Sequence, residues 1–210
     1  MNATPLLRLP TVGIVSTGES GNVYNLKKVF SSLNCPIKLI ETAEDLKGIH
    51  GLVLPGVGAF SHAIHSLESR RLTACLKEAI SVLPTLGICL GMHLLASFGE
   101  EGKPTQGFDQ IPGQIKKMNC LVLPHLGFAS IHLQKSSSLL FNHVSKEDTF
   151  YFMHSYEFVS DHHISSYADY NGYPFVASIE KDNIFGVQFH PEKSRESGIK
   201  LIKNFIRIMG

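Results

Sequence analysis

The first half of the chain alternates short apolar runs with helix-like segments, and this alternation constrains the fold more than any other feature. Four of the apolar runs read as buried strands, at residues 11–16, 36–40, 50–55 and 84–89. Apolar residues at helical spacing follow the first run, and residues 61–80 form a second helix-like stretch. Because crossover helices join parallel strands, we predict a parallel sheet covered by helices on both faces.

The second half carries a different pattern. Its short segments bounded by turn residues read as strands with few helices between them, at 114–118, 128–133, 149–155, 164–169, 174–180 and 183–189. A closing helix is expected from the apolar stripe of Ile199, Ile202, Phe205, Ile206 and Met209. We therefore predict an α/β fold with a single open, mostly parallel sheet, flanking helices and an antiparallel extension. One domain is expected to span residues 1–210.

The composition narrows the function classes. Hydrophobic residues make up 43% of the 210 residues, so a sizeable core is expected, whereas 19 basic and 18 acidic residues do not favour a nucleic-acid or membrane-surface partner. No apolar run approaches the roughly 18–20 residues that span a membrane, and residues 1–10 lack signal-peptide features. The four cysteines are far apart in the sequence, and no pair of them has the spacing of a metal site or of a C-x-x-C redox motif. We expect a cytoplasmic protein with reduced thiols at Cys35, Cys75, Cys89 and Cys120.

Cys89 stands between two glycines at the end of the fourth predicted strand. Residues 87–91, GICLG, have the G-x-nucleophile-x-G form of a nucleophile elbow, in which glycines relieve crowding around a sharp strand-to-helix turn. A helix that begins at Leu90 would direct its free N–H groups and positive dipole end toward the sulfur, which favours the thiolate. The alternative for so short a motif is a small buried cysteine at a tight turn.

A nucleophilic cysteine needs a base, and His190 has the context that fits best among the eleven histidines. His190 ends a predicted strand, as Cys89 does, and Pro191 then stops that strand. Glu192 is close enough to orient the imidazole by a hydrogen bond, which gives a nucleophile, a base and an orienting acid. Ligands of open α/β sheets bind at the carboxyl ends of the strands. A solvent-exposed turn is the alternative for H-P-E.

A glycine-rich segment, LPGVGAF (54–60), follows the third predicted strand. Gly56 and Gly58 allow the backbone to turn an N–H group toward a ligand. Together with the N–H of Leu90, this segment would complete an oxyanion hole. Taken alone, it is better explained as a plain glycine-rich turn.

The segments PGVGAF, GICLGM and GVQFHPEKS, in this order, resemble the class I (triad) glutamine amidotransferases, and the resemblance covers nearly the whole chain. Within that family the chain is most similar to the glutaminase subunit of imidazole glycerol phosphate synthase, through segments 20–30, 124–127, 151–156, 177–194 and 200–205. The resemblance implies hydrolysis of glutamine to glutamate and ammonia in histidine biosynthesis. It also implies a heterodimer with a (β/α)8-barrel cyclase, to which the ammonia is channelled. No metal or cofactor is expected.

The resemblance also assigns roles to individual residues. The catalytic residues would be Cys89 as nucleophile, His190 as base and Glu192 as its partner. The oxyanion hole would be formed by Gly56, Val57, Gly58 and Leu90. Glutamine would be bound by His93, Glu101, His154, Ser155 and Tyr156. The partner would be faced by Asn22, Phe128, Tyr151 and Lys193.

Three departures from the family's pattern leave alternatives open. The first loop (16–22) has one extra residue, His93 replaces the usual glutamine, and Phe128 and Ala129 replace the usual Trp-Asn pair. The close alternative is a paralogous glutaminase that supplies ammonia to a surface-polysaccharide sugar pathway. A catalytically silent docking or regulatory subunit is a second alternative. A nucleotide-binding module is disfavoured because residues 17–22 match neither G-x-G-x-x-G nor G-x-x-x-x-G-K-[ST]. A cysteine peptidase or hydrolase is disfavoured by H-P-E and Glu101.

Overall fold

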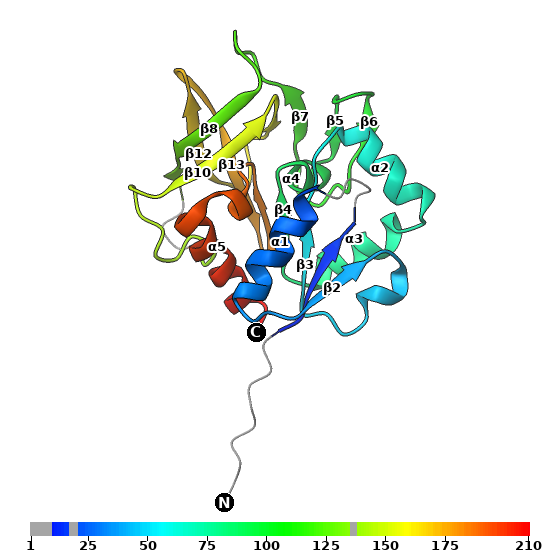
Figure 1. Cartoon of the computed structure of the whole chain (residues 1–210). Coiled ribbons are helices and arrows are strands. Elements are labelled where there is room, and N and C mark those ends of the chain that lie inside the picture. The colour runs from blue at the N-terminus through cyan, green and yellow to red at the C-terminus, as the bar shows by residue number, and fades with distance from the viewer. Residues whose placement is uncertain (1–9, 17–20, 135–137) are drawn as a thin grey trace, which may run out of the picture.

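The centre of the molecule is an eight-stranded sheet in the order β2-β1-β3-β4-β14-β13-β12-β9 (Figure 1). The computed structural model describes residues 10–16, 21–134 and 138–210, without the side chains of residues 21 and 22. Five adjacent strands are parallel: β2 (Ile37–Ile40), β1 (Val12–Val15), β3 (Gly51–Leu54), β4 (Thr85–Ile88) and β14 (Ile184–Val187). Three strands continue the sheet in antiparallel pairing: β13 (Tyr173–Lys181), β12 (Ile164–Tyr170) and β9 (His132–Leu133). The predicted mostly parallel sheet with an antiparallel extension is confirmed.

The predicted strands at 114–118 and 149–155, and the first part of the one at 128–133, lie outside this sheet, which differs from the single sheet expected. The first smaller sheet pairs β8 (His125–Ser130) with β10 (Thr149–His154). The second has the order β11-β7-β5-β6, with bounds Tyr156–Val159, Gln114–Lys117, Phe98–Gly99 and Thr105–Gln106. The chain changes from one sheet to the other at Ser155, between β10 and β11. Alternating polarity predicts a strand but not its neighbour, so the pattern alone does not reveal this division.

The described residues form five α-helices: α1 (Gly21–Ser32), α2 (Phe60–Ser69), α3 (Thr73–Val82), α4 (Leu90–Leu94) and α5 (Arg195–Ile208). Two short 3-10 turns are η1 (Ala43–Leu46) and η2 (Pro191–Lys193). None of the helices in the described ranges is long and apolar enough to cross a bilayer.

The single helix-like stretch expected at residues 61–80 is wrong, because α2 and α3 are separate helices. Arg71 takes a left-handed conformation, with φ of 58°, and the N–H of Leu72 donates to the carbonyl of Leu67 at 2.9 Å. Leu67, Leu72 and Leu76 are nevertheless all fully buried. The apolar spacing therefore continues across the break, and periodicity alone could not locate it.

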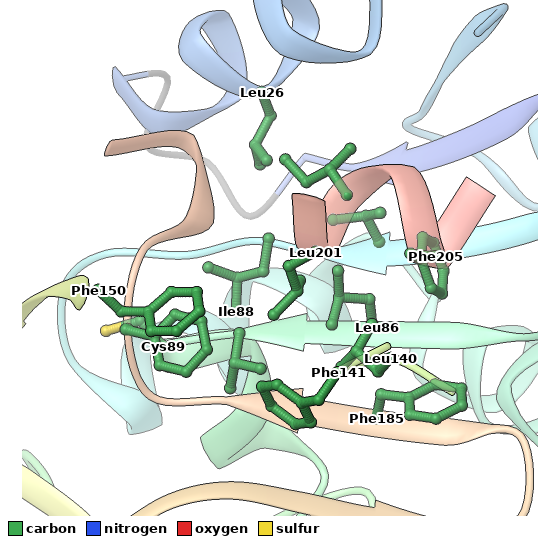
Figure 2. Close-up of a cluster of buried hydrophobic side chains, with 14 of the residues drawn as sticks. Leu26, Leu86, Ile88, Cys89, Leu140, Phe141, Phe150, Phe185, Leu201 and Phe205 are labelled. Atoms are coloured by element: carbon green, nitrogen blue, oxygen red, sulfur yellow. The ribbon is translucent and has the colours of Figure 1, made fainter. Parts of the chain in front are cut away.

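Two hydrophobic cores cover the two faces of the main sheet, as the helix-strand alternation predicts. One core packs α1 and α5 against the sheet and reaches Phe150 and Phe152 of β10. Figure 2 shows Leu26, Leu201 and Phe205 in this core, with Cys89 at its border beside Phe150. The other core packs α2 and α3 against the opposite face.

The topology brings the three sequence motifs to one edge of the sheet. The glycine-rich segment follows β3, Cys89 follows β4, and His190 comes three residues after the end of β14. These strands are direct neighbours and run in the same direction. Their carboxyl ends therefore lie side by side, which is where open α/β sheets bind ligands.

Candidate active site

Cys89 forms a strained turn between β4 and α4. Its backbone has φ of 52° and ψ of −109°, outside the regions that side chains other than glycine prefer. The N–H of Cys89 donates to the carbonyl of Val187 at 2.8 Å, and the N–H of His93 donates to the carbonyl of Cys89 at 3.1 Å. The turn therefore ends the sheet and begins the helix at the same residue, as the elbow motif predicts.

Each of the two glycines that flank Cys89 is required by a different close contact of the backbone. A Cβ at Gly91 would lie 1.6 Å from the carbonyl oxygen of Leu54 in β3, and a Cβ at Gly87 would lie 2.6 Å from the carbonyl oxygen of Gly91. Gly91 thus lets α4 pack directly on the backbone of β3, and Gly87 lets the turn fold back on its own strand. A buried structural cysteine would require neither contact.

His190 and Glu192 form a fully buried pair beside Cys89. The Nδ1 of His190 lies 2.9 Å from Oε1 of Glu192, and both side chains have no exposed surface. Burial by itself lowers the pKa of His190, but the neighbouring Cys89 thiolate and the Glu192 carboxylate raise this pKa to about 10. The raised pKa favours an imidazolium at neutral pH, held between the sulfur of Cys89 and the carboxyl group of Glu192, which is the arrangement of a cysteine prepared for nucleophilic attack.

The sulfur opens onto a cavity of about 420 Å³. The residues that line it come from the glycine-rich segment, the elbow and α4, the loop between β5 and β6, the residue before β8, and the junction of β10 and β11: Val57, Gly58, Ala59, Cys89, Leu90, His93, Glu101, Pro124, Met153, His154, Ser155 and Tyr156. All five residues that the resemblance assigned to glutamine line this cavity. The size is at the small end of typical ligand sites, which fits an amino acid.

Two ionisable side chains of the cavity, Glu101 and His154, have pKa values shifted by burial. The carboxylate of Glu101 accepts a hydrogen bond from the N–H of Phe60 at 3.2 Å, and burial raises the pKa of this carboxyl group. His154 donates from Nδ1 to the carbonyl of Tyr156 at 2.9 Å, and its Nε2 lies 3.3 Å from Nδ1 of His125. Burial lowers the pKa of His154 to about 3, so this imidazole is neutral at physiological pH.

Sequence reasoning missed Gln188 and Met153, which both contact the sulfur. The Nε2 of Gln188 donates to Sγ of Cys89 at 3.8 Å, and the carbonyl oxygen of Met153 lies 4.0 Å from the same atom. One indication for Gln188 was available in the sequence, its position two residues before His190. In an extended chain, side chains two residues apart point in the same direction. Met153 acts through its backbone, so its side chain gave no signal.

The expected oxyanion segment lies beside the cavity. Gly58 has φ of +97°, a conformation that favours glycine, and Gly58 and Val57 line the cavity. Gly56 is not among the described residues that line it; a Cβ at Gly56 would approach Leu90 to 3.0 Å. Gly56 therefore allows the segment to pack on the elbow. Leu90 begins α4, so helix geometry leaves its N–H without an intrahelical partner.

Three of the residues expected to face a partner, Phe128, Tyr151 and Lys193, lie together with Arg195, which was not expected, and we define these four residues as the aromatic-basic patch. The rings of Phe128 and Tyr151 meet edge to face with centroids 5.3 Å apart. Nζ of Lys193 lies 5.7 Å from the Tyr151 ring centroid, and the Arg195 guanidinium lies 4.9 Å from that of Phe128. The side chain of Asn22 and loop residues 17–20 lie outside the described part of the chain.

Metal ligation was not expected from the sequence. In the ranges that the structure describes, no group of three or more histidine, cysteine or acidic side chains is placed to hold an ion.

Several known proteins of similar sequence are subunits of one synthase. The chain is 38% identical over 198 residues to the "Imidazole glycerol phosphate synthase subunit HisH" of Desulfitobacterium hafniense (strain Y51), with 92% of each chain covered. The HisH subunit of Moorella thermoacetica is 36% identical, with 92% of this chain and 93% of the relative covered. That of Leptospira interrogans is 35% identical, with 92% and 98% covered.

Solved structures show the same fold at low identity. One described as a glutamine amidotransferase has a TM-score of 0.75 at 15% identity and covers 95% of this chain and 98% of its own. PurLQS from Thermotoga maritima has a TM-score of 0.73 at 15% identity, with 96% of this chain and 99% of that chain covered. The sequence pattern of the family described as "Glutamine amidotransferase class-I" matches residues 17–209. The chain therefore belongs to the class-I glutamine amidotransferase family.

Proposed function

We propose that this chain is the glutaminase subunit of imidazole glycerol phosphate synthase. It hydrolyses glutamine to glutamate and ammonia, and the ammonia passes to a (β/α)8-barrel cyclase partner in a heterodimer. The observation that supports the chemistry most strongly is the buried pair of His190 and Glu192 beside a cysteine that opens onto a cavity. The pathway is supported by HisH relatives that are 35–38% identical over most of the chain.

The first half of the reaction forms a thioester. The Cys89 thiolate attacks the carboxamide carbon of glutamine, and the carbonyl electrons move onto oxygen. The tetrahedral intermediate collapses as His190, which begins as an imidazolium, gives its proton to the departing nitrogen. Ammonia leaves, and the glutamyl group remains on sulfur. Glu192 holds the imidazole through Nδ1 and balances its charge before this transfer.

The second half releases glutamate. His190, now neutral, takes a proton from water as the water oxygen attacks the thioester carbon. The intermediate collapses with the thiolate as leaving group, so the imidazolium-thiolate pair is restored. The N–H of Leu90 and the backbone of Val57 and Gly58 stabilise the oxyanion in both halves. One such donor is typically worth about 3 kcal/mol of transition-state stabilisation.

The lining of the cavity offers groups that can hold the substrate. Glu101 is a half-buried acidic side chain on the cavity wall, and its carboxylate binds the α-ammonium group of glutamine. His154, Ser155 and Tyr156 also line the cavity, and the neutral imidazole of His154 adds no charge that would repel the substrate. Glutamine is thereby held with its carboxamide at the sulfur.

The aromatic-basic patch is proposed as part of the surface that contacts the cyclase. Phe128 is 44% exposed, and its neighbour on the same face of β8, Leu126, is 59% exposed. Apolar surface of this kind, beside a lysine and an arginine, suits a stable protein interface. Tyr151 also connects the patch to the site, because its carbonyl accepts a hydrogen bond from the N–H of His190 at 2.8 Å.

The alternatives receive less support. The relatives named above favour the synthase over a sugar-modifying paralogue, and the buried Cys89, His190 and Glu192 array favours an enzyme over a silent docking subunit. We propose that residues 1–210 form one glutamine amidotransferase domain, because both cores share the central sheet. The cytoplasmic location stays a prediction.

The proposal is tested by glutamine hydrolysis in the assembled complex. The chain is mixed with a barrel cyclase of the histidine pathway and an acceptor analogue, and glutamate release is measured. Wild type should turn over, whereas Cys89→Ala should be inactive with glutamine yet still support the cyclase reaction when ammonium salts are supplied. Full glutamine hydrolysis by Cys89→Ala would refute the assignment of the nucleophile. Failure of any such cyclase to activate the wild-type chain would refute the partner.

A further inference from the structure

Gln188 is a fully buried amide that joins the nucleophile to His93. Its Nε2 donates to Sγ of Cys89 at 3.8 Å, and its Oε1 lies 2.8 Å from Nε2 of His93. The next residue, Phe189, points the other way and packs on Phe150, with ring centroids 4.1 Å apart. Gln188 and His190 therefore approach the sulfur from the same segment of chain, one with an amide and one with an imidazolium.

The reactive thiolate form of Cys89 fixes the orientation of this amide. A thiolate only accepts hydrogen bonds, so the NH₂ group of Gln188 must face Cys89 and the oxygen must face His93. His93 must then carry its proton on Nε2. Burial lowers the pKa of His93 to about 4, which keeps the ring neutral with a single proton. Nδ1 of His93 has no hydrogen-bond partner among the described residues, and an unpaired lone pair is tolerated better than an unpaired N–H.

We propose that Gln188 is a positioning residue for the nucleophile and that His93 acts through it. His93 holds the amide oxygen, the amide nitrogen holds the sulfur, and together they stabilise the thiolate in addition to His190. This inference rests on the proposed function only in taking Cys89 as the nucleophile. It also assigns His93 a task that does not require contact with glutamine.

Several other ionisable groups face the sulfur or its cavity. His190 follows β14 and is held by Glu192, His154 lies on β10, and Glu101 lies on the cavity wall. Because His154 is neutral, His190 supplies the positive charge at the sulfur. Gln188 adds one hydrogen bond from a neutral amide to the charged sulfur, at the long distance of 3.8 Å. Its loss should therefore change thiolate stability by about tenfold, or about one pH unit, and should leave the ion pair in place.

The test measures the rate of Cys89 alkylation by iodoacetamide across pH, with peptide-resolved mass spectrometry and without glutamine. Gln188→Met should raise the pH midpoint of alkylation by about one unit and lower kcat about tenfold, with a smaller change in KM. The matched control is Thr85→Val, which removes a fully buried hydroxyl that donates to the carbonyl of Leu83 at 3.0 Å, on the strand that leads to Cys89. Its midpoint should equal that of wild type.

A second pair of variants keeps the inference testable if Gln188→Met does not fold. His93→Phe removes the donor to the amide oxygen and should raise the midpoint, whereas His93→Gln supplies an NH₂ group there and should restore it. The Gln188→Met/His93→Phe double variant should shift no further than Gln188→Met alone.

Unchanged midpoints in Gln188→Met and His93→Phe, an equal shift in Thr85→Val, or additive shifts in the double variant would overturn the inference. A shift in alkylation without any glutamine hydrolysis would leave the inference standing and refute the proposed function. The two can therefore fail separately.

Discussion

Gly91→Ala adds one methyl group at the closest backbone contact of the active-site turn. The new Cβ would lie 1.6 Å from the carbonyl oxygen of Leu54, whereas such contacts are essentially never shorter than 3.0 Å. The elbow and β3 must therefore separate by about 1.4 Å. Leu54, Leu90 and Met92 around this contact are at most 2% exposed, so no loose side chain can absorb the movement. Overpacking of this kind costs 1–3 kcal/mol, and backbone pressing on backbone places it at about 3 kcal/mol.

The expected result is a loss of both stability and activity. For a domain of this size, about 3 kcal/mol lowers the Tm by roughly 6–12 °C. A displacement of about 1 Å at the nucleophile costs roughly a hundredfold in rate, so kcat should fall at least that far. The measurements are thermal unfolding by circular dichroism and glutamate release in the complex, both at a temperature where the variant is folded.

The matched control is Gly172→Ala, in the turn between β12 and β13. Gly172 has φ of +82° and nothing within 4 Å of an added Cβ, so alanine there meets backbone strain alone, of about 1 kcal/mol. Its kcat should match wild type. If Gly91→Ala were as stable and as active as Gly172→Ala, the steric explanation of the G-x-C-x-G motif would be wrong.

Four further outcomes are expected. His190→Ala should lower glutamine turnover about as far as Cys89→Ala, because the two residues act as a unit. Glu192→Gln should have a smaller effect, and single-turnover thioester formation from labelled glutamine distinguishes the His190 variant from the Glu192 variant. Cys89→Gly should be more stable than Cys89→Ala by about 1 kcal/mol in urea unfolding, because glycine relieves the positive φ. Burial opposes ionisation of Asp148, but hydrogen bonds, the largest from Lys200, lower its pKa from 3.8 to about 2. The carboxylate therefore stabilises the fold above pH 4, so Asp148→Asn should cost about 2 kcal/mol at pH 7, and the difference should shrink as pH falls toward 2. Without its partner the chain should hydrolyse glutamine slowly. A partner that stabilises the flipped, active conformation of segment 56–58 by about 3–4 kcal/mol should accelerate hydrolysis several hundredfold, and rapid hydrolysis by the lone chain would contradict this gating.

Much of the fold could be predicted because its parallel strands are buried on both faces. Such strands are continuous apolar runs, and β1, β3 and β4 are buried along their whole length. The strands of the second half are less determined by their own residues. The segments around Ser155 are strand-like on both sides, yet β10 and β11 join different sheets. The choice depends on β8 and β7, which are distant in sequence, so local polarity carries no information about it.

The site could be predicted where its chemistry lies in consecutive residues. The proximity of Cys89 to His190 follows from two motifs at the ends of adjacent parallel strands. Gln188 could not be weighed in this way, because its role depends on the register of β14 against β4, where Val187 lies opposite Ile88. A glutamine at the end of a strand has many ordinary explanations. It becomes informative only when the structure places its amide between a sulfur and a buried imidazole.

The strain at Cys89 explains why these neighbours are needed together. A residue other than glycine with φ of 52° and ψ of −109° costs roughly 1–3 kcal/mol, and it persists only where the surroundings determine the backbone on every side. The N–H of Cys89 donates to the carbonyl of Val187, and the carbonyl of Cys89 accepts from the N–H of His93. Gly91 allows the backbone of β3 to pack directly against the turn. A relaxed turn would not satisfy both hydrogen bonds while packing on β3. The strain is thus located at the residue whose sulfur reacts, and the flanking glycines allow the surrounding backbone to maintain it.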